Sequence, residues 1–160
     1  MSDAKVILVA DDDENDVFFL RRAFAKCGLL HTIIHVSDGQ KAIEYVLGEG
    51  IYGDRKSNPF PDLLLLDLKM PKTDGFDVLV TLRSVPELDL PVVVFSTSAL
   101  MVDIQMAKKL GVADYIAKPV DQDEMVKVVL ALNERWLSGA SPRKSDVVEG
   151  GLRRKHHLPP

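Results

Sequence analysis

The sequence has little cysteine, no long hydrophobic run and no strong excess of one charge. Its 160 residues contain one cysteine, Cys27, which excludes an intramolecular disulfide and a thiolate zinc cluster and fits a reducing compartment. No apolar run approaches the roughly 18 residues that span a bilayer. The net charge of −4 is too small to indicate a nucleic-acid or membrane partner. We therefore expect a cytoplasmic protein that binds neither.

The length and composition are those of one folded domain with a tail. The chain is 46% hydrophobic and 28% charged, close to the averages of globular proteins. From Ser138 onward, Ser, Gly, Pro and basic side chains replace the apolar pattern. This change predicts a folded domain over residues 1–137 and a flexible C-terminal tail over residues 138–160.

Five short apolar runs have the composition of β-strands. Most of them lack the two-residue alternation of half-exposed strands, which favours strands buried on both faces of a parallel sheet. The runs are Val6 to Ala10, Thr32 to Val36, Leu63 to Leu66, Val92 to Phe95 and Ala113 to Ala117.

Segments with helical periodicity follow each of these runs. In the first segment we expect Asn15 or Asp16 to cap the helix and Gly28 to end it. The alternation of strand and helix predicts an α/β fold with a doubly wound, five-stranded parallel sheet, (βα)5. Residues 48–62, rich in Gly and Pro, form a long connection that we expect at the surface. The helical segments are 15–27, 39–47, 75–83, 99–110 and 121–137.

Acidic side chains follow two of the predicted strands directly. Asp11, Asp12 and Asp13 come after the first run, and Asp67 comes after the third. In open α/β sheets, ligands bind at the C-terminal ends of the strands. If these two strands are neighbours, their carboxylates share a pocket, and a hard divalent cation such as Mg²⁺ would offset their repulsion. Acids stand where a dinucleotide site would carry glycines, which argues against that cofactor.

The remaining strand ends supply groups that bind phosphate. Ser96, Thr97 and Ser98 follow the fourth run, and their hydroxyls are hydrogen-bonding partners for phosphoryl oxygens. Lys118 follows the fifth run and provides a point charge for phosphate. Together with the acids, these groups indicate phosphoryl transfer onto a carboxylate, a reaction that depends on positioning and charge neutralisation.

Four motifs in order along the chain resemble the receiver domain of two-component response regulators. They are ILVADDD (7–13), LLLLDLKMPKTDG (63–75), VVVFSTSA (92–99) and GVADYIAKP (111–119). The resemblance implies a flavodoxin-like receiver fold over residues 5–137. The long loop before the second motif and the absence of an output domain are similar to the single-domain regulators associated with cyanobacterial phytochromes.

The resemblance also implies a role for each motif residue. Asp67 would take a phosphoryl group from a histidine kinase, with Ser96 and Lys118 binding the phosphoryl oxygens. Mg²⁺ would be held by Asp12, Asp67 and the backbone carbonyl of Lys69, with Asp11 acting through water. Counting back from Gly111 and Lys118 favours Ser96 over its neighbours as the hydroxyl.

On phosphorylation, the resemblance implies that Ser96 shifts inward and Tyr115 follows. The face made by the fourth helix, fifth strand and fifth helix then changes, and it would bind a protein partner or a second copy of the chain. The kinase would be a sensor histidine kinase, phytochrome-like in the narrower resemblance. The chain would act as a signalling protein that performs its own phosphotransfer, and not as an enzyme with a separate substrate.

Simpler interpretations of the same residues remain. The acids of residues 11–16 would also suit a helix start, where negative charge is favourable. A phosphohydrolase with an aspartyl nucleophile would need a second acid where Lys69 stands, and a receiver that signals without phosphate would be expected to lack an acid or the lysine.

The histidines, including His31 and His35, have no metal-ligand spacing and are predicted at the surface.

Overall fold

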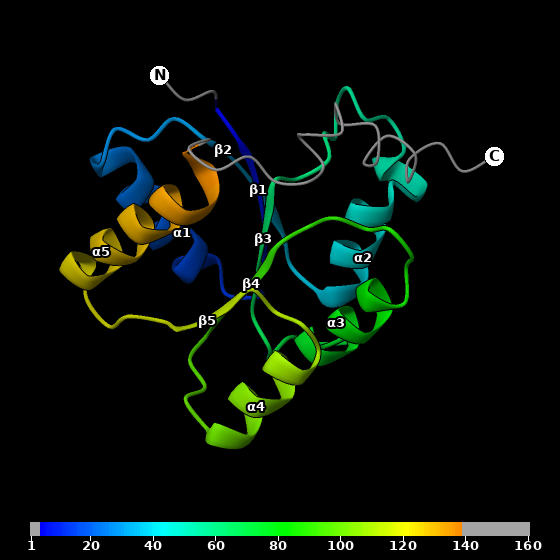
Figure 1. Ribbon diagram of the computed structural model, residues 1–160. Helices are drawn as coiled ribbons and strands as arrows, with labels where there is room; N and C mark the ends of the chain where they lie inside the picture. The colour runs from blue at the N-terminus through cyan, green and yellow to red at the C-terminus, as the bar shows by residue number, and fades with distance from the viewer. Residues whose placement is uncertain (1–3, 139–160) are drawn as a thin grey trace.

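All five strands of the sheet run parallel, in the order β2-β1-β3-β4-β5. The computed structural model describes residues 4–138, and Figure 1 shows the sheet between two groups of helices. The predicted doubly wound α/β fold is therefore confirmed, with the first and third strands as neighbours. The strands are β1 (Val6–Ala10), β2 (Thr32–Val36), β3 (Leu63–Leu66), β4 (Val92–Ser96) and β5 (Asp114–Ala117).

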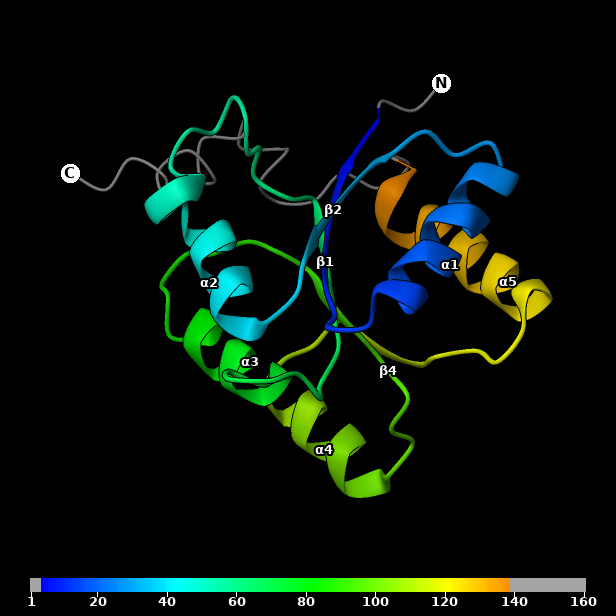
Figure 2. The same ribbon diagram turned by 180° about the vertical axis from the view of Figure 1, so that it is seen from behind.

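Helices cover both faces of the sheet, and alternate strand residues point to each layer. In β3, Leu63 and Leu65 pack beneath α1 and α5, whereas Leu64 and Leu66 pack toward α2, α3 and α4. Figure 2 shows the two layers from behind. All four leucines are fully buried, which explains the unbroken apolar run. The helices are α1 (Glu14–Lys26), α2 (Gly39–Leu47), α3 (Gly75–Arg83), α4 (Met101–Lys109) and α5 (Gln122–Leu132).

The sequence predicted some helix ends wrongly. Helix α1 is capped by Asp13, whose side chain accepts the Asn15 amide, and not by Asn15 or Asp16. Helix α4 begins at Met101, because residues 97–100 form the loop that leaves β4. Helix α5 ends at Leu132 and continues as a π-helical turn, η2 (Asn133–Leu137). In η2, Leu137 is buried against the layer of α1 and α5.

The connection over residues 48–62 is anchored to the end of α2. It contains a short 3₁₀ turn, η1 (Gly50–Tyr52). The Arg55 guanidinium donates to the carbonyl oxygens of Tyr45 at 2.8 Å and Val46 at 2.6 Å, so a side chain satisfies helix-end carbonyls that would otherwise lack partners. The Tyr45 hydroxyl donates to the Pro59 carbonyl at 2.9 Å. The predicted surface loop is thus partly a packed element.

Within residues 4–138, none of the helices has the length and apolar character needed to cross a bilayer. The predicted tail, apart from Ser138, lies outside the described residues.

Gly75 lets the start of α3 approach the end of β3. A Cβ atom at this position would lie 2.4 Å from the carbonyl oxygen of Asp67 and 2.7 Å from the Cα of Leu68. We expect Gly75→Ala to lower the free energy of unfolding by about 1–3 kcal/mol, because backbone must shift to make room. Urea unfolding measures this change.

Gly53→Ala is the matched control. Gly53 has an ordinary φ of −69°, and an added Cβ would meet only atoms at 3.4 Å or more. This variant should be neutral or slightly stabilising. Equal stabilities for the two variants would contradict the proposed packing at Gly75.

Candidate functional site

The acids of β1 and β3 meet at the C-terminal edge of the sheet. The Asp67 amide donates to the Ala10 carbonyl at 2.9 Å, which places the residue after β3 beside the residue after β1. Carboxylate oxygens of Asp11, Asp12 and Asp67 lie within 4.8 Å of one another. Asp11 and Asp67 are buried, whereas Asp12 is exposed. The acidic pocket expected from the sequence is therefore confirmed.

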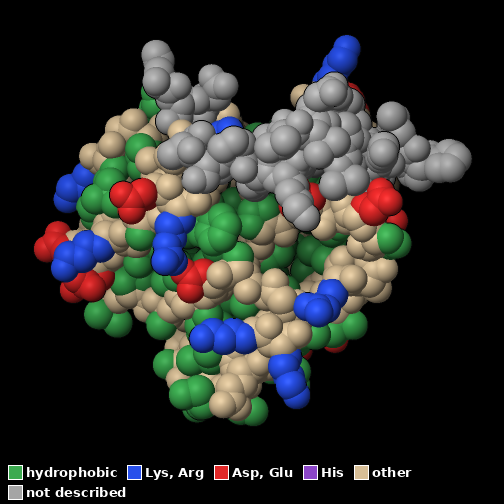
Figure 3. Space-filling view, viewed as in Figure 1, with side chains coloured by type: hydrophobic (Ala, Val, Ile, Leu, Met, Phe, Trp, Pro, Cys, Tyr) green, Lys and Arg blue, Asp and Glu red, His purple; other side chains and the backbone are tan. Residues whose placement is uncertain are grey.

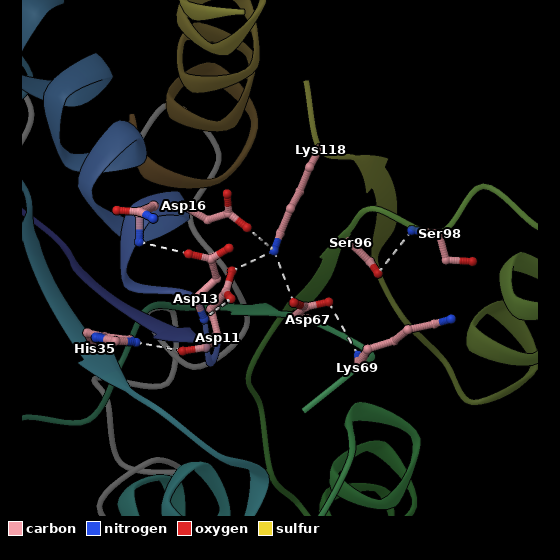
Figure 4. A network of polar contacts seen from close by, with 10 residues as sticks. Asp11, Asp13, Asp16, His35, Asp67, Lys69, Ser96, Ser98 and Lys118 are labelled. Carbon is pink, nitrogen blue, oxygen red and sulfur yellow. Dashed lines mark hydrogen bonds and ion pairs between the residues drawn. The ribbon is translucent and has the colours of Figure 1, made fainter. Parts of the chain in front are cut away.

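Lys118 brings positive charge into this acidic pocket from β5. Its amide donates to the Ser96 carbonyl at 2.8 Å, which fixes where its side chain begins. Its Nζ lies 2.7 Å from Asp11, 2.7 Å from Asp16 and 3.0 Å from Asp67 (Figure 4). An ammonium has three protons, and here three carboxylates accept them.

Burial and charge shift the pKa values of this cluster in a consistent way. Burial raises the pKa of Asp11 to about 6, against the lowering effect of its hydrogen bonds from Lys118 and the Asp13 amide. Burial alone would lower the pKa of the Lys118 ammonium, but its hydrogen bonds to Asp11 and Asp16 raise that pKa above its ordinary range. Lys118 therefore stays charged, and Asp11 in the metal-free protein loses its proton at about pH 6.

The donor set of this pocket fits a hard divalent cation. Such cations prefer oxygen ligands, and three carboxylates converge here with one of them exposed to solvent. The Lys69 amide donates to Asp67 Oδ1 at 3.3 Å, so its main chain lies beside the same carboxylate, while its side chain is exposed. A cation would also offset the negative charge that Lys118 alone leaves uncompensated.

The hydroxyl groups after β4 form a second part of the site. Ser96 at the end of β4 and Ser98 are buried, whereas Thr97 between them is exposed. The Ser98 amide donates to Ser96 Oγ at 3.3 Å. The Ser98 hydroxyl donates to Asp103 at 2.5 Å, and the Tyr115 hydroxyl donates to the Ser98 carbonyl at 2.8 Å. A chain of hydrogen bonds thus links Ser96 to α4 and β5.

Sequence reasoning missed two residues of this site. The sequence pattern marks Asp16 only as a helix-start acid, but its carboxylate accepts a hydrogen bond from Lys118. His35 was predicted at the surface, but it is half-buried and its Nε2 donates to the Asp11 carbonyl at 2.6 Å. His31 is also half-buried and accepts the Lys5 amide at 3.0 Å. The register of β2 against β1 creates these histidine contacts, and no local pattern signals it.

Comparisons with known proteins identify the class to which this fold and site belong. Residues 7–130 match the family model of the response regulator receiver domain, so the chain belongs to that family. It is a receiver of two-component signalling.

Among its relatives are regulators linked to phytochromes. The chain is 32% identical to the response regulator Rcp1 of Synechocystis sp. over 83% of this chain and 89% of Rcp1. The phosphorylated cyanobacterial phytochrome response regulator RcpA superposes with a TM-score of 0.78 at 36% identity, covering 87% of this chain and 98% of RcpA. The regulator RPA3017, from red light signalling of R. palustris, superposes with a TM-score of 0.80 at 33% identity, covering 86% of this chain and 96% of RPA3017. A Mn²⁺-bound form of Rcp1 is also similar, with a TM-score of 0.75 at 31% identity, covering 86% of this chain and 97% of Rcp1.

In the metal-free protein, we expect a pH-dependent difference in stability between wild type and Asp11→Asn. Burial raises the pKa of Asp11 from 3.8 to about 6, so between pH 4 and 6 the unfolded chain ionises Asp11 while the folded protein does not. As the pH rises from 4 to 6, the free energy of unfolding of the wild type should therefore fall by roughly 1–3 kcal/mol relative to that of the variant. Above pH 6 the difference should level off.

Urea unfolding of both proteins at pH 4, 5, 6 and 7, in the presence of a chelator, measures this difference. If it were constant from pH 4 to 7, the carboxyl of Asp11 would ionise at the same pH in the folded and unfolded states.

Proposed function

We propose that Asp67 accepts a phosphoryl group from a phosphohistidine of a sensor kinase and that the change in charge switches a binding surface of this protein. One observation carries the proposal. The Asp67 carboxylate is buried at the end of β3, with Lys118 at 3.0 Å and two further acids beside it. A buried carboxylate with a fixed cation and a candidate metal pocket suits phosphoryl transfer.

In the proposed reaction, an oxygen of Asp67 forms a bond to phosphorus while the bond from phosphorus to the kinase imidazole breaks. The imidazole nitrogen keeps the bonding electron pair. Lys118 neutralises the phosphoryl oxygens, and the Ser96 hydroxyl donates to one of them. Ser96 ends β4, which is next to β3, and Lys118 follows the edge strand β5, from which its long side chain reaches Asp67 at 3.0 Å. A group attached to Asp67 is therefore within reach of both side chains.

We assign Mg²⁺ as the cofactor of the transfer. Asp12, Asp67 and the Lys69 carbonyl would bind it directly, and Asp11 would act through water. The bound cation would neutralise charge on the phosphoryl group during transfer. The converging carboxylates support this assignment, as does the Mn²⁺-bound form of the relative Rcp1.

The first test is the mass of the intact protein after incubation with Mg²⁺ and acetyl phosphate. We expect one phosphoryl adduct on the wild type, and no adduct on Asp67→Asn or after chelation of the metal. Asp77→Asn, which changes an exposed acid at the start of α3, is the control and should keep the adduct. An adduct of equal yield on Asp67→Asn would refute the assignment of the phosphoacceptor.

We further propose that Ser96 and Tyr115 transmit the change. An inward move of Ser96 toward the phosphoryl group would break its contact with the Ser98 amide, now 3.3 Å long. The Tyr115 hydroxyl holds the carbonyl of the same Ser98, so it would have to move with this loop. The hydrogen bond from Ser98 to Asp103 carries the change into α4. This arrangement supports a switch between two states.

The surface that changes would be formed by α4, β5 and α5, and we propose that it binds a second copy of the chain. Helix α4 exposes three large apolar side chains, with exposed fractions of 65% for Met101, 64% for Val102 and 47% for Met106. Apolar side chains gather over α4 at the bottom of Figure 3. Burying them in a dimer would be favourable.

Val102→Lys should prevent this dimer, since it would bury an unpaired charge. We expect wild type treated with Mg²⁺ and beryllofluoride, a phosphoryl mimic, to sediment as a dimer and the variant to remain a monomer. Val80→Lys on α3, where the valine is 55% exposed, is the matched control and should dimerise normally. A wild type that stays monomeric with the mimic would exclude this interface.

The relatives support a phytochrome-type sensor kinase as the donor of the phosphoryl group, since RcpA is a phytochrome response regulator and RPA3017 acts in red light signalling. We propose that the receiver comprises residues 1–137, acts in the cytoplasm and turns over no separate substrate. The family match over residues 7–130 lies within this proposed domain.

A further inference from the structure

We propose that Asp16 is a positioning residue that holds the Lys118 ammonium against Asp67. The inference rests on the proposed phosphorylation of Asp67. Its basis is the 2.7 Å contact between Asp16 Oδ2 and Lys118 Nζ, which is as short as the contact of Lys118 with Asp11.

The start of α1 leaves the Asp16 side chain free for this contact. Asp13 already caps the helix by accepting the Asn15 amide at 2.9 Å. Asp16 is the third residue of α1, and its carboxylate points to Lys118 (Figure 4). Its side chain is 30% exposed, whereas that of Lys118 is 6% exposed. Asp16 therefore closes the outer side of the cluster, with the ammonium behind it.

The Lys118 ammonium has three protons, so its contact with Asp16 helps to set the direction of the proton that faces Asp67. Contacts with Asp11 and Asp16 take two of the three Lys118 protons, and tetrahedral geometry then directs the third toward Asp67. With Asp16 removed, only two of these contacts remain. The ammonium would then occupy a range of orientations, and fewer of them would suit a phosphoryl oxygen on Asp67.

The structure also provides space into which an unrestrained Lys118 would move. A pocket of about 120 Å³ lies between α1 and the start of α5, and both Asp16 and Lys118 line it. Phe19, Val120 and Met125 form much of its apolar wall. Loss of the Asp16 carboxylate would enlarge this pocket beside the ammonium, on the side away from Asp67.

A purely structural role for Asp16 predicts different results. In that case the ion pair would only fasten α1 to the sheet. Helix α1 already buries Val17, Leu20 and Phe24 against the sheet, so it has an anchor that does not depend on the ion pair. A fastening role would change the stability of the protein without changing the orientation of Lys118.

The test compares Asp16→Ala, which removes the acceptor, with Asp16→Asn, which keeps an acceptor oxygen but removes the charge. Glu14→Gln is the control, because it removes one charge from the same turn at an exposed position. The rate of phosphorylation is measured with acetyl phosphate at saturating Mg²⁺. We expect Asp16→Ala to lower the maximal rate about tenfold with little change in the half-saturating donor concentration. Asp16→Asn should stay within about twofold of wild type, and Glu14→Gln should be unchanged.

A second measurement needs neither metal nor phosphate. Nitrogen-15 relaxation of the Lys118 ammonium in the metal-free protein should report a rigid group in wild type and Asp16→Asn, and a mobile group in Asp16→Ala. Urea unfolding of each variant confirms that the protein is folded under the conditions used.

The outcomes separate this inference from the proposal on which it rests. If wild type and Asp16→Ala react at the same rate, positioning by Asp16 is refuted and phosphorylation of Asp67 stands. If Asp16→Asn is as slow as Asp16→Ala while Lys118 stays rigid in both, Asp16 acts by charge and the positioning role is again refuted. If the wild type takes no phosphoryl group, both proposals fall.

Discussion

The ammonium of Lys118 makes it feasible to bury two carboxylates at one edge of this sheet. Asp11 and Asp67 are both buried, and like charges so close would otherwise drive protons onto the acids or push the strand ends apart. One lysine contacts both acids, and a third acid completes its hydrogen bonds. The residual negative charge suits a divalent cation. Burial still raises the pKa of Asp11 to about 6, although Lys118 acts to lower it.

The parallel sheet is what brings these groups together. Asp67 follows β3 at the centre of the sheet, Asp11 follows β1 on one side, and Ser96 ends β4 on the other. Lys118 comes from the edge strand β5 and crosses the end of β4 to reach the acids. A lysine side chain is long enough for this crossing. Its four methylene groups pack along apolar surface, while the ammonium at its end reaches the polar site. The apolar layers on both faces hold the strand ends in register.

The site is also connected to a distant surface through one loop. Ser96, Ser98 and Tyr115 are joined by hydrogen bonds, and Ser98 continues the connection to Asp103 on α4. These contacts depend on a few donors and acceptors and not on deep apolar packing. Among the described helices, α4 buries a single residue, Ala107, in contrast to α1 and α2, so the proposed movement of α4 would disturb little apolar packing.

The fold class, the strand positions and the edge of the sheet that carries the site follow from the amino-acid sequence. Unbroken apolar runs identify buried parallel strands, and the residues directly after them must lie at the ligand-binding edge. This rule predicts the acids of residues 11–13, Asp67, the hydroxyls of residues 96–98 and Lys118 at that edge, whereas the choice among neighbouring acids and hydroxyls came from the resemblance to receivers. Three contacts could not be predicted in this way: that of Asp16 with Lys118, the hydrogen bond of His35 to Asp11 and the anchoring of the loop by Arg55. Each of these contacts joins separate elements through side chains whose directions depend on strand register and helix packing. The local sequence shows which side chains can form hydrogen bonds and ion pairs, but the packing of the elements in three dimensions determines which of these side chains come into contact.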